Sequence, residues 1–232
     1  MSESEPASAL PFEAAPDPTA LAHLLDTCTD FAPPPLVPEV RAFQARSLVE
    51  IWDAAEALAG RTLPAPFWAY AWAGGIALAR VLLDDCVKVR GLRVLDVGAG
   101  GGIASLAAAR AGAERVLAND IDPWALATAA LAAARQGLRI ETSGSDLTVT
   151  PVVPGEHDVV LASDLSYEKQ VAPKQRALLE RARAAGARVL VADAGRTYFE
   201  ERGLSELAAF TVAVPNDLEG VSERRARVFE MR

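Results

Sequence analysis

The sequence is poor in the residues from which metal centres and hydrolytic sites are built. Its two cysteines, Cys28 and Cys86, stand apart, without the spacing of a metal site or a redox pair. We therefore expect free thiols in a reducing compartment. The two histidines likewise have no matching cluster of cysteine, serine or carboxylate residues. The sequence predicts neither a metal site nor a hydrolytic triad.

Positive charge is also scarce. Lysine and arginine together number 23 against 31 acidic residues, which gives a formal net charge of −8, and only three of the basic residues are lysines. No basic stripe could track a phosphate backbone, so nucleic acid is not an expected partner. No apolar run reaches membrane-spanning length, and the acidic, proline-rich first residues fit neither a secretory signal nor a transit peptide. We expect a cytoplasmic monomer that does not bind membranes.

The chain does contain enough apolar residues for one sizeable core. With 232 residues, 51% of them hydrophobic, we expect a single domain over 36–232. Residues 1–35 begin with a Pro/Glu/Ala/Ser-rich stretch and are expected to be disordered or weakly ordered, apart from a short helix over 20–28. Residues 36–90 are expected to form a helical and aromatic extension, whose apolar spacing predicts one helix over 38–59.

Beyond residue 91, strands and helices alternate. Strands are predicted at 92–97, 115–119, 139–142, 158–163 and 188–193. Helices are predicted at 103–111, 123–136 and 170–185. Apolar runs at 210–214 and 226–230 fit an antiparallel hairpin at the sheet edge. This alternation predicts an α/β fold over 91–232, with a Rossmann-like, mainly parallel sheet and helices on both faces.

The most informative stretch is Val94-Leu95-Asp96-Val97-Gly98-Ala99-Gly100-Gly101-Gly102, a short strand that runs into a glycine-rich turn. The dinucleotide fingerprint G-x-G-x-x-G would need a glycine at the position of Ile103. The spacing is instead D-x-G-x-G-x-G, and its leading acid suits a ligand with an ammonium group. The pattern resembles motif I of seven-strand S-adenosylmethionine-dependent methyltransferases; the alternative is a glycine turn in another α/β protein. The resemblance assigns cofactor binding to Asp96, Gly98, Gly100 and Gly102.

Two further strand ends are predicted to complete the cofactor site. Asp120 follows the second strand, where an acid can accept hydrogen bonds from both ribose hydroxyls; the alternative is a helix cap, a role better suited to Asp122. Ile121, between them, is included in the predicted site. After the third strand, Asp146 could accept the adenine amino group, and Leu147 could supply an N–H and an apolar contact. The alternative for Asp146 is an ordinary turn residue.

The fourth strand ends in Ser163-Asp164-Leu165-Ser166-Tyr167-Glu168, where an open parallel sheet places its ligands. Ser163 is predicted to contact the cofactor and Glu168 the methyl acceptor. A lysine acceptor, with a pKa of about 10.4 in water, must lose its proton before it attacks a methyl group. Asp164 could bind and orient the ammonium, while Tyr167 could line the alkyl channel and hydrogen-bond the amine. Asp164 and Tyr167 are the predicted catalytic residues; the alternative is that both are merely strand-end residues.

An aromatic segment over 66–75 precedes the alternating part of the chain. Phe67, Trp68, Tyr70 and Trp72 could all be core residues, which is the commoner fate of aromatic side chains. Trp72, however, stands just before a pair of glycines, and an indole face is a favourable neighbour for a sulfonium or ammonium group. We predict that Trp72 contacts the cofactor and that Trp68 contacts the acceptor.

From Leu36 to the C-terminus the chain resembles the electron transfer flavoprotein β-subunit lysine methyltransferases. The segments that carry the resemblance are Val37-Pro38-Glu39-Val40-Arg41, Pro66-Phe67-Trp68-Ala69-Tyr70-Ala71-Trp72-Ala73-Gly74-Gly75, Ala118-Asn119-Asp120-Ile121-Asp122-Pro123, Ser163-Asp164-Leu165-Ser166-Tyr167 and Asp193-Ala194-Gly195-Arg196. The resemblance implies a seven-strand class I methyltransferase fold, S-adenosylmethionine as cofactor and the flavoprotein β-subunit as substrate. It also maps the acid and the tyrosine of the family's Gly-Asp-x-Phe-Tyr motif onto Asp164 and Tyr167.

The chain departs from that family at three positions. Ala73 replaces a proline, Ser166 replaces a phenylalanine, and Ala194 interrupts the family's Asp-Pro-Gly-Arg. Ser166 opens space beside the expected acceptor channel. The alternatives are therefore a methyltransferase for another protein, such as a ribosomal protein, or for a small amine, and a non-catalytic module that binds S-adenosylmethionine. The presence of both Asp164 and Tyr167 favours an enzyme over a module.

Overall fold

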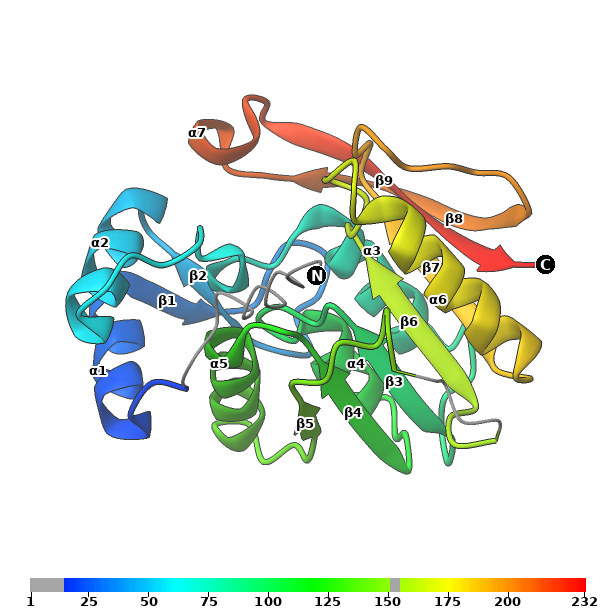
Figure 1. Cartoon of the computed structure of the whole chain (residues 1–232), viewed down its shortest axis with the longest axis horizontal. Helices are drawn as coiled ribbons and strands as arrows, with labels where there is room; N and C mark the ends of the chain where they lie inside the picture. Colours follow the sequence, from blue (N-terminus) through cyan, green and yellow to red (C-terminus); the bar gives the residue numbers. More distant parts are fainter. Residues whose placement is uncertain (1–14, 151–154) are drawn as a thin grey trace, which may run out of the picture.

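The computed structural model describes residues 15–150 and 155–232. These residues form a seven-stranded sheet in the order β5-β4-β3-β6-β7-β9-β8 (Figure 1). The strands are β3 (Arg93–Val97), β4 (Arg115–Asn119), β5 (Glu141–Ser143), β6 (Val159–Ser163), β7 (Arg188–Asp193), β8 (Leu204–Ala213) and β9 (Glu223–Met231). The first five in this spatial order are parallel, and β9 runs antiparallel to both β7 and β8. The order reverses between β3 and β6, so the carboxyl ends of these two strands meet where such folds bind ligands.

Helices cover both faces of this sheet, as the alternation predicts. Alternate residues of one strand point to opposite faces, and Val94 accordingly belongs to a different buried cluster from Leu95. The first face packs against α3 (Ala73–Leu83), α4 (Ile103–Arg110) and α5 (Pro123–Ala134), and the second against α6 (Ala172–Ala184). From β3 to β7, the predicted strands and helices are confirmed to within two residues at each end.

The hairpin expected near the C-terminus is present, in a longer form. β8 and β9 pair from Leu204 opposite Met231 to Ala213 opposite Glu223, with a bulge between Glu206 and Ala208. The short helix α7 (Asn216–Glu219) lies in the connection between the two strands. No helix in the described residues is long and apolar enough to cross a membrane.

In the N-terminal extension, only the second half of the helix predicted over 38–59 is helical. Its first part contains the strand β2 (Ala42–Ala45), which pairs antiparallel with β1 (Thr29–Ala32), and only α2 (Leu48–Ala59) is helical. Phe43 is buried, as the periodicity suggests, but it is buried from a strand. Ser47 caps α2 by accepting a hydrogen bond from the N–H of Glu50 at 3.3 Å, so the helix begins after this residue. A short apolar run does not distinguish a strand from a helix by its period alone.

The segment 1–35, expected to be disordered or weakly ordered, contains folded structure from α1 (Pro18–Cys28) onward. Asp17 caps this helix by accepting hydrogen bonds from the N–H groups of Thr19 and Ala20 at 3.1 and 2.9 Å. Leu21 and Leu25 are buried in the same cluster as the sheet face that α3 covers. The short helix expected over 20–28 is confirmed and begins two residues earlier, whereas composition did not reveal that its leucines are buried. Residues 1–14, which carry the remainder of this prediction, lie outside the described residues.

Candidate functional site

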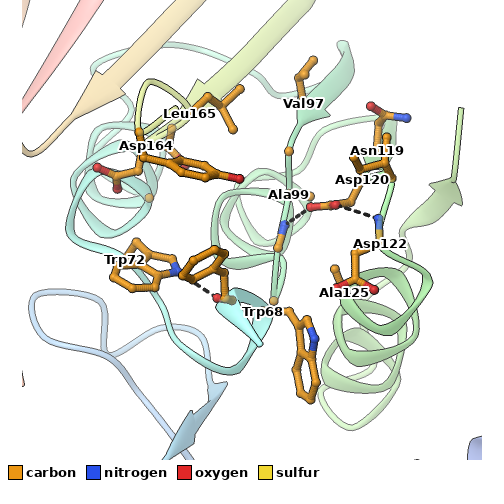
Figure 2. A pocket seen from close by; sticks show the side chains of 18 of the residues that line it. Trp68, Trp72, Val97, Ala99, Asn119, Asp120, Asp122, Ala125, Asp164 and Leu165 are labelled. Atoms are coloured by element: carbon orange, nitrogen blue, oxygen red, sulfur yellow. Dashed lines mark hydrogen bonds between the residues drawn. The ribbon is translucent and has the colours of Figure 1, made fainter. Parts of the chain in front are cut away.

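A cavity of about 580 Å³ opens at the carboxyl ends of β3, β4 and β6. This volume lies within the range of sites that enclose small molecules. Two groups of residues line it (Figure 2). We call the first the β4 side, which comprises Gly100, Asn119, Asp120 and Asp146. We call the second the β6 side, which comprises Phe67, Trp72, Asp164, Tyr167 and Arg196.

The glycine turn after β3 requires glycine for different reasons at different positions. At Gly98, φ is +64° and a Cβ would lie 2.3 Å from the Leu165 side chain. At Gly101, a Cβ would lie 2.5 Å from the backbone carbonyl oxygen of Trp68, which cannot move aside without displacing the chain. Gly100 faces open space. Gly102 does not line the cavity, and a Cβ there would meet Ala129 at 2.7 Å, so this predicted cofactor residue serves helix packing. The sequence analysis did not single out Gly101.

Asp120 occupies the position predicted for a ribose-binding acid. Its Oδ2 accepts a hydrogen bond from the N–H of Gly100 at 2.9 Å, and its Oδ1 accepts one from the N–H of Asp122 at 3.0 Å. Burial raises the pKa of Asp120, whereas these two N–H groups lower it. Asp122 caps α5 as predicted, accepting from the N–H of Trp124 at 2.8 Å. Ile121, 41% exposed, also lines the cavity.

Asp146 and Leu147 both reach the cavity, as predicted. The Oδ1 of Asp146 accepts hydrogen bonds from the N–H and the hydroxyl of Thr148, at 2.8 and 2.6 Å, which is the turn arrangement considered as the alternative. Asn119 is a lining residue that sequence reasoning missed. It is buried, and its Nδ2 donates to the carbonyls of Ser143 and Ser145 at 2.9 Å each, so it ties the end of β4 to the turn that carries Asp146.

Asp96, predicted to hold an ammonium group, does not line the cavity. Its side chain is 1% exposed, and it accepts a hydrogen bond from the Ser105 hydroxyl of α4 at 2.6 Å. Burial raises the pKa of Asp96 to about 7. Strand alternation explains this placement, because Asp96 lies on the same face of β3 as Val94, the face that α4 covers. In the described structure this acid joins β3 to α4.

Asp164 lies at the end of β6 in a left-handed conformation, with φ of +53°. Its Oδ2 accepts a hydrogen bond from the N–H of Gly74 in the first turn of α3 at 2.7 Å. Its Oδ1 accepts from the N–H of Ala194 and from Nε of Arg196, both at 3.2 Å. Burial raises the pKa of Asp164, whereas the Arg196 guanidinium lowers it. The predicted partner of this carboxylate was an acceptor ammonium; the structure gives it a guanidinium of the chain itself.

Trp68, the predicted acceptor contact, and Phe67 both line the cavity, but their rings lie in different parts of it. The Trp68 ring is 4% exposed and stacks on that of Trp124 with centroids 5.9 Å apart, beside α5 and away from Asp164 (Figure 2). The 44% exposed ring of Phe67 instead faces the Tyr167 ring, with centroids 5.6 Å apart. The cause is the 3₁₀ helix η1 (Phe67–Ala69), which turns consecutive side chains in different directions. No feature of the sequence marks Phe67 rather than Trp68.

Trp72 lines the cavity and forms the N-cap of α3. Its Nε1 donates to the carbonyl oxygen of Phe67 at 2.8 Å, which holds the indole in place. The guanidinium carbon of Arg196 lies 5.0 Å from the centroid of this ring. A cation therefore does lie over Trp72, as its chemistry suggested, and Arg196 supplies it.

The remaining predicted residues lie on the same stretch after β6. Ser163, Tyr167 and Glu168 all line the cavity, and Tyr167 and Glu168 are exposed. Tyr167 still loses part of its hydration inside the cavity, and this partial desolvation, followed by the carboxylates of Glu168 and Asp120, raises its pKa. Tyr167 and Asp120 line the same cavity, one on each side of it. In the described residues, no group of three His, Cys, Asp or Glu side chains could hold a metal ion.

Comparison with known proteins identifies relatives of the chain. A family model described as a methyltransferase domain matches residues 94–202. The chain is 36% identical over 158 residues to the electron transfer flavoprotein beta subunit lysine methyltransferase of Rattus norvegicus, a match that covers 65% of this chain and 60% of the rat protein. The corresponding protein of Xenopus laevis is 34% identical over 191 residues, with 80% of this chain and 76% of that protein covered. The chain thus spans about three fifths of the rat relative.

Among solved structures, the fold resembles that of magnesium protoporphyrin IX methyltransferase from Synechocystis PCC 6803 with bound SAM. The TM-score is 0.50 at 19% identity, with 68% of this chain and 78% of that chain covered, so the likeness concerns the fold alone. The Xenopus relative has the identity and the coverage that indicate common family membership. The chain belongs to the electron transfer flavoprotein beta subunit lysine methyltransferase family.

Proposed function

We propose that this protein is an S-adenosylmethionine-dependent lysine N-methyltransferase whose substrate is the electron transfer flavoprotein β-subunit. The names of the rat and Xenopus relatives give the substrate class. The observation that carries the proposal is the cavity itself. One wall of it carries the carboxylate of Asp120, which is fixed beside the glycine turn. The opposite wall, past β3, carries the exposed rings of Phe67 and Tyr167.

The β4 side has the chemistry to hold the cofactor. Asp120 ends β4 with a carboxylate already oriented by two N–H groups, and its remaining lone pairs can accept from ribose hydroxyls. The open space at Gly100 allows a ligand to approach the backbone closely. Asp146 and Leu147 offer a polar and an apolar contact for the adenine. When bound, S-adenosylmethionine supplies an electrophilic methyl group.

The β6 side has the chemistry to receive a lysine. The facing rings of Phe67 and Tyr167 can enclose the alkyl chain, and the Tyr167 hydroxyl can accept a hydrogen bond from the amine or donate one to it. Asp164 acts from behind this surface: its bonds to Gly74 and Ala194 fix the strand end from which Tyr167 projects. Holding the amine in line with the methyl group can remove much of the barrier. The proton of the ammonium leaves to solvent through the open mouth of the cavity.

Mass spectrometry can test this proposal directly. The enzyme is incubated with isotopically labelled S-adenosylmethionine and recombinant electron transfer flavoprotein, and the modified peptides are mapped. We expect label on lysine side chains of the β-subunit. Parallel incubations with a ribosomal protein and with small amines test the other methyltransferase readings. Binding of S-adenosylmethionine without transfer to any acceptor would favour the non-catalytic module.

A further inference from the structure

A chain of charged side chains leads from the cavity to the β8–β9 connection. Arg196 donates from Nε to Asp164 at 3.2 Å and from Nη2 to Glu219 of α7 at 3.1 Å. Glu219 in turn accepts from Nε of Arg224 at 3.1 Å. The side chain of Glu219 is only 4% exposed, so a carboxylate is buried between two guanidinium groups. A charge in such a place is tolerated because it is paired and hydrogen-bonded.

Arg196 and Asp164 both line the cavity, and Arg196 is the residue that connects it to Glu219. Its guanidinium lies over Trp72, its side chain is 18% exposed, and its backbone N–H donates to Asp193 at 2.8 Å. Asp193 also accepts from the N–H of Gly195 at 2.7 Å, so the turn after β7 is held as well as the side chain. Arg196 is therefore held in three ways: its backbone N–H bonds to Asp193, the face of its guanidinium packs on Trp72, and the edges of the guanidinium bond to carboxylates.

We propose that Arg196 is a positioning residue of the acceptor site: held by the buried Glu219 and by Trp72, it fixes Asp164 and the strand end that carries Tyr167. This inference rests on the proposed function. It gives α7, which is far from β6 in the sequence, a part in arranging the site. Arginine suits this role because its planar group can bond to two carboxylates along different edges and still stack on an indole.

The surroundings of Asp164 make its charge depend on Arg196. From α3 it meets only an N–H, that of Gly74, and from the turn after β7 it meets the N–H of Ala194 and the guanidinium. The other ionisable group nearby, Asp193, is a like charge; burial first, and then Asp164 among other groups, raises the pKa of Asp193 to about 6. Loss of Arg196 would leave two buried acids side by side without a cation, so Asp164 would bind a proton at a higher pH.

The test compares Arg196→Gln with Arg188→Gln, using recombinant electron transfer flavoprotein as acceptor. Arg188 forms a similar two-bond pair with Glu230 at the opposite end of β7, away from the cavity. We expect Arg196→Gln to lower kcat/KM for methyl transfer by roughly tenfold to a hundredfold, as misplacement near a reacting group does. Its dissociation constant for S-adenosylmethionine should change less than about threefold, because the proposed ribose and adenine contacts lie on the β4 side. Arg188→Gln should leave both quantities near wild type.

The pH profile and a rescue variant distinguish positioning from general damage. Since the acceptor lysine must already be deprotonated, log kcat/KM should rise with pH with a slope near one for wild type and should become steeper for Arg196→Gln, where Asp164 also titrates. Arg196→Lys retains a positive charge and should restore the wild-type slope with only part of the rate. A folded Arg196→Gln enzyme with the profile of Arg188→Gln would overturn the inference.

A stability cycle keeps this inference separate from the proposed function. The pH dependence of unfolding is measured for wild type, Arg196→Gln, Asp164→Asn and the double variant. Stability falls as the pH rises through the pKa of Asp164 in the folded protein. In Arg196→Gln this fall should continue to a higher pH, because folded Asp164 keeps its proton to a higher pH. In the Asp164→Asn background this extension should vanish. If the flavoprotein is not methylated, the proposed function fails; if the cycle shows no coupling, the assignment of Arg196 fails.

Discussion

The two sides of the cavity are built from different kinds of bond. On the β4 side, side chains are held by backbone groups near them in the sequence or on the adjacent strand: Asp120 by Asp122, Asp146 by Thr148, and Asn119 by Ser143. On the β6 side, Asp164 is held by Gly74 and Arg196, and Arg196 is held by Glu219. These four residues come from four different parts of the fold: α3, the end of β6, the turn after β7, and α7. The first side depends on local backbone geometry, and the second depends on the assembled fold.

This difference bears on how the two sides respond to change. N–H groups of a turn are neutral and remain in place when a neighbouring side chain is replaced. Buried charges on the β6 side depend on each other, since removal of one leaves its partner uncompensated. We therefore expect substitutions on the β4 side to have separate effects and substitutions on the β6 side to be coupled.

Asp96→Asn should have the largest effect, and it should act on stability. Burial raises the pKa of Asp96 from 3.8 to about 7, so the folded protein holds a proton that the unfolded chain releases. This contribution to stability is complete below pH 4 and is lost as the pH rises through 7, by on the order of 4 kcal/mol. Asparagine can still accept from Ser105 but cannot titrate, so the variant should be more stable than wild type at pH 8. Urea unfolding at pH 5 and pH 8 measures this.

Asp158→Asn is the matched control for that experiment. Hydrogen bonds from the side chain and backbone of Arg93 lower the pKa of Asp158 to about 2, the opposite direction from Asp96. Its contribution is present above the unfolded pKa and is lost as the pH falls toward 2, so the asparagine variant should be less stable at neutral pH. If both variants shift stability in the same direction at pH 8, burial does not control Asp96.

Asp164→Asn should have the next largest effect, on turnover. Asparagine keeps the shape and an oxygen for the N–H of Gly74 but removes the charge opposite Arg196. Methyl transfer should fall by roughly a hundredfold or more, the range assigned to positioned ionisable groups. Steady-state kinetics with the flavoprotein, together with calorimetry of S-adenosylmethionine binding, separates the two sides. Near-normal turnover would show that the β6 side does not depend on this charge.

Asp120→Ala should have a smaller effect and confine it to binding. Loss of charge-assisted hydrogen bonds to the ribose should weaken S-adenosylmethionine at least tenfold, or about 1.4 kcal/mol. The turn around Gly100 loses one acceptor but keeps its backbone bonds, so the melting temperature should change little. Calorimetry on a folded variant that gives wild-type affinity would remove Asp120 from the cofactor site.

The contrast between the sides also explains which parts of the site could be predicted. Asp120, Asp146 and Asp164 were all located because residues that follow parallel strands must gather at one sheet edge. The strands and helices after residue 91 were located because their apolar periods are regular. Neither argument depends on tertiary detail.

What could not be predicted depends on which way a side chain points and on contacts between distant elements. Asp96 directs its carboxylate to Ser105 because strand alternation, and not its place in the motif, decides its face. Phe67, and not Trp68, faces Tyr167 because η1 is a single tight turn that points consecutive side chains in different directions. The partner of Asp164 is Arg196, a contact that exists only once β6 and β7 are side by side. The pairing of β1 with β2, which replaced half of a predicted helix, is likewise a tertiary contact.

Phe67→Ala should give the smallest effect, and it tests whether this ring belongs to the acceptor surface. The ring is 44% exposed and faces Tyr167, so its loss should remove part of the wall around the lysine side chain without leaving a deep core cavity. We expect the KM for the flavoprotein to rise by roughly threefold to tenfold, which matches the energy of a partly exposed aromatic contact, while kcat changes less. Tyr198→Ala is the matched control, because Tyr198 is similarly exposed, at 40%, and does not line the cavity. Equal effects from the two variants would indicate a general loss of surface contact, and an unchanged KM for Phe67→Ala would leave Tyr167 as the aromatic residue that meets the substrate.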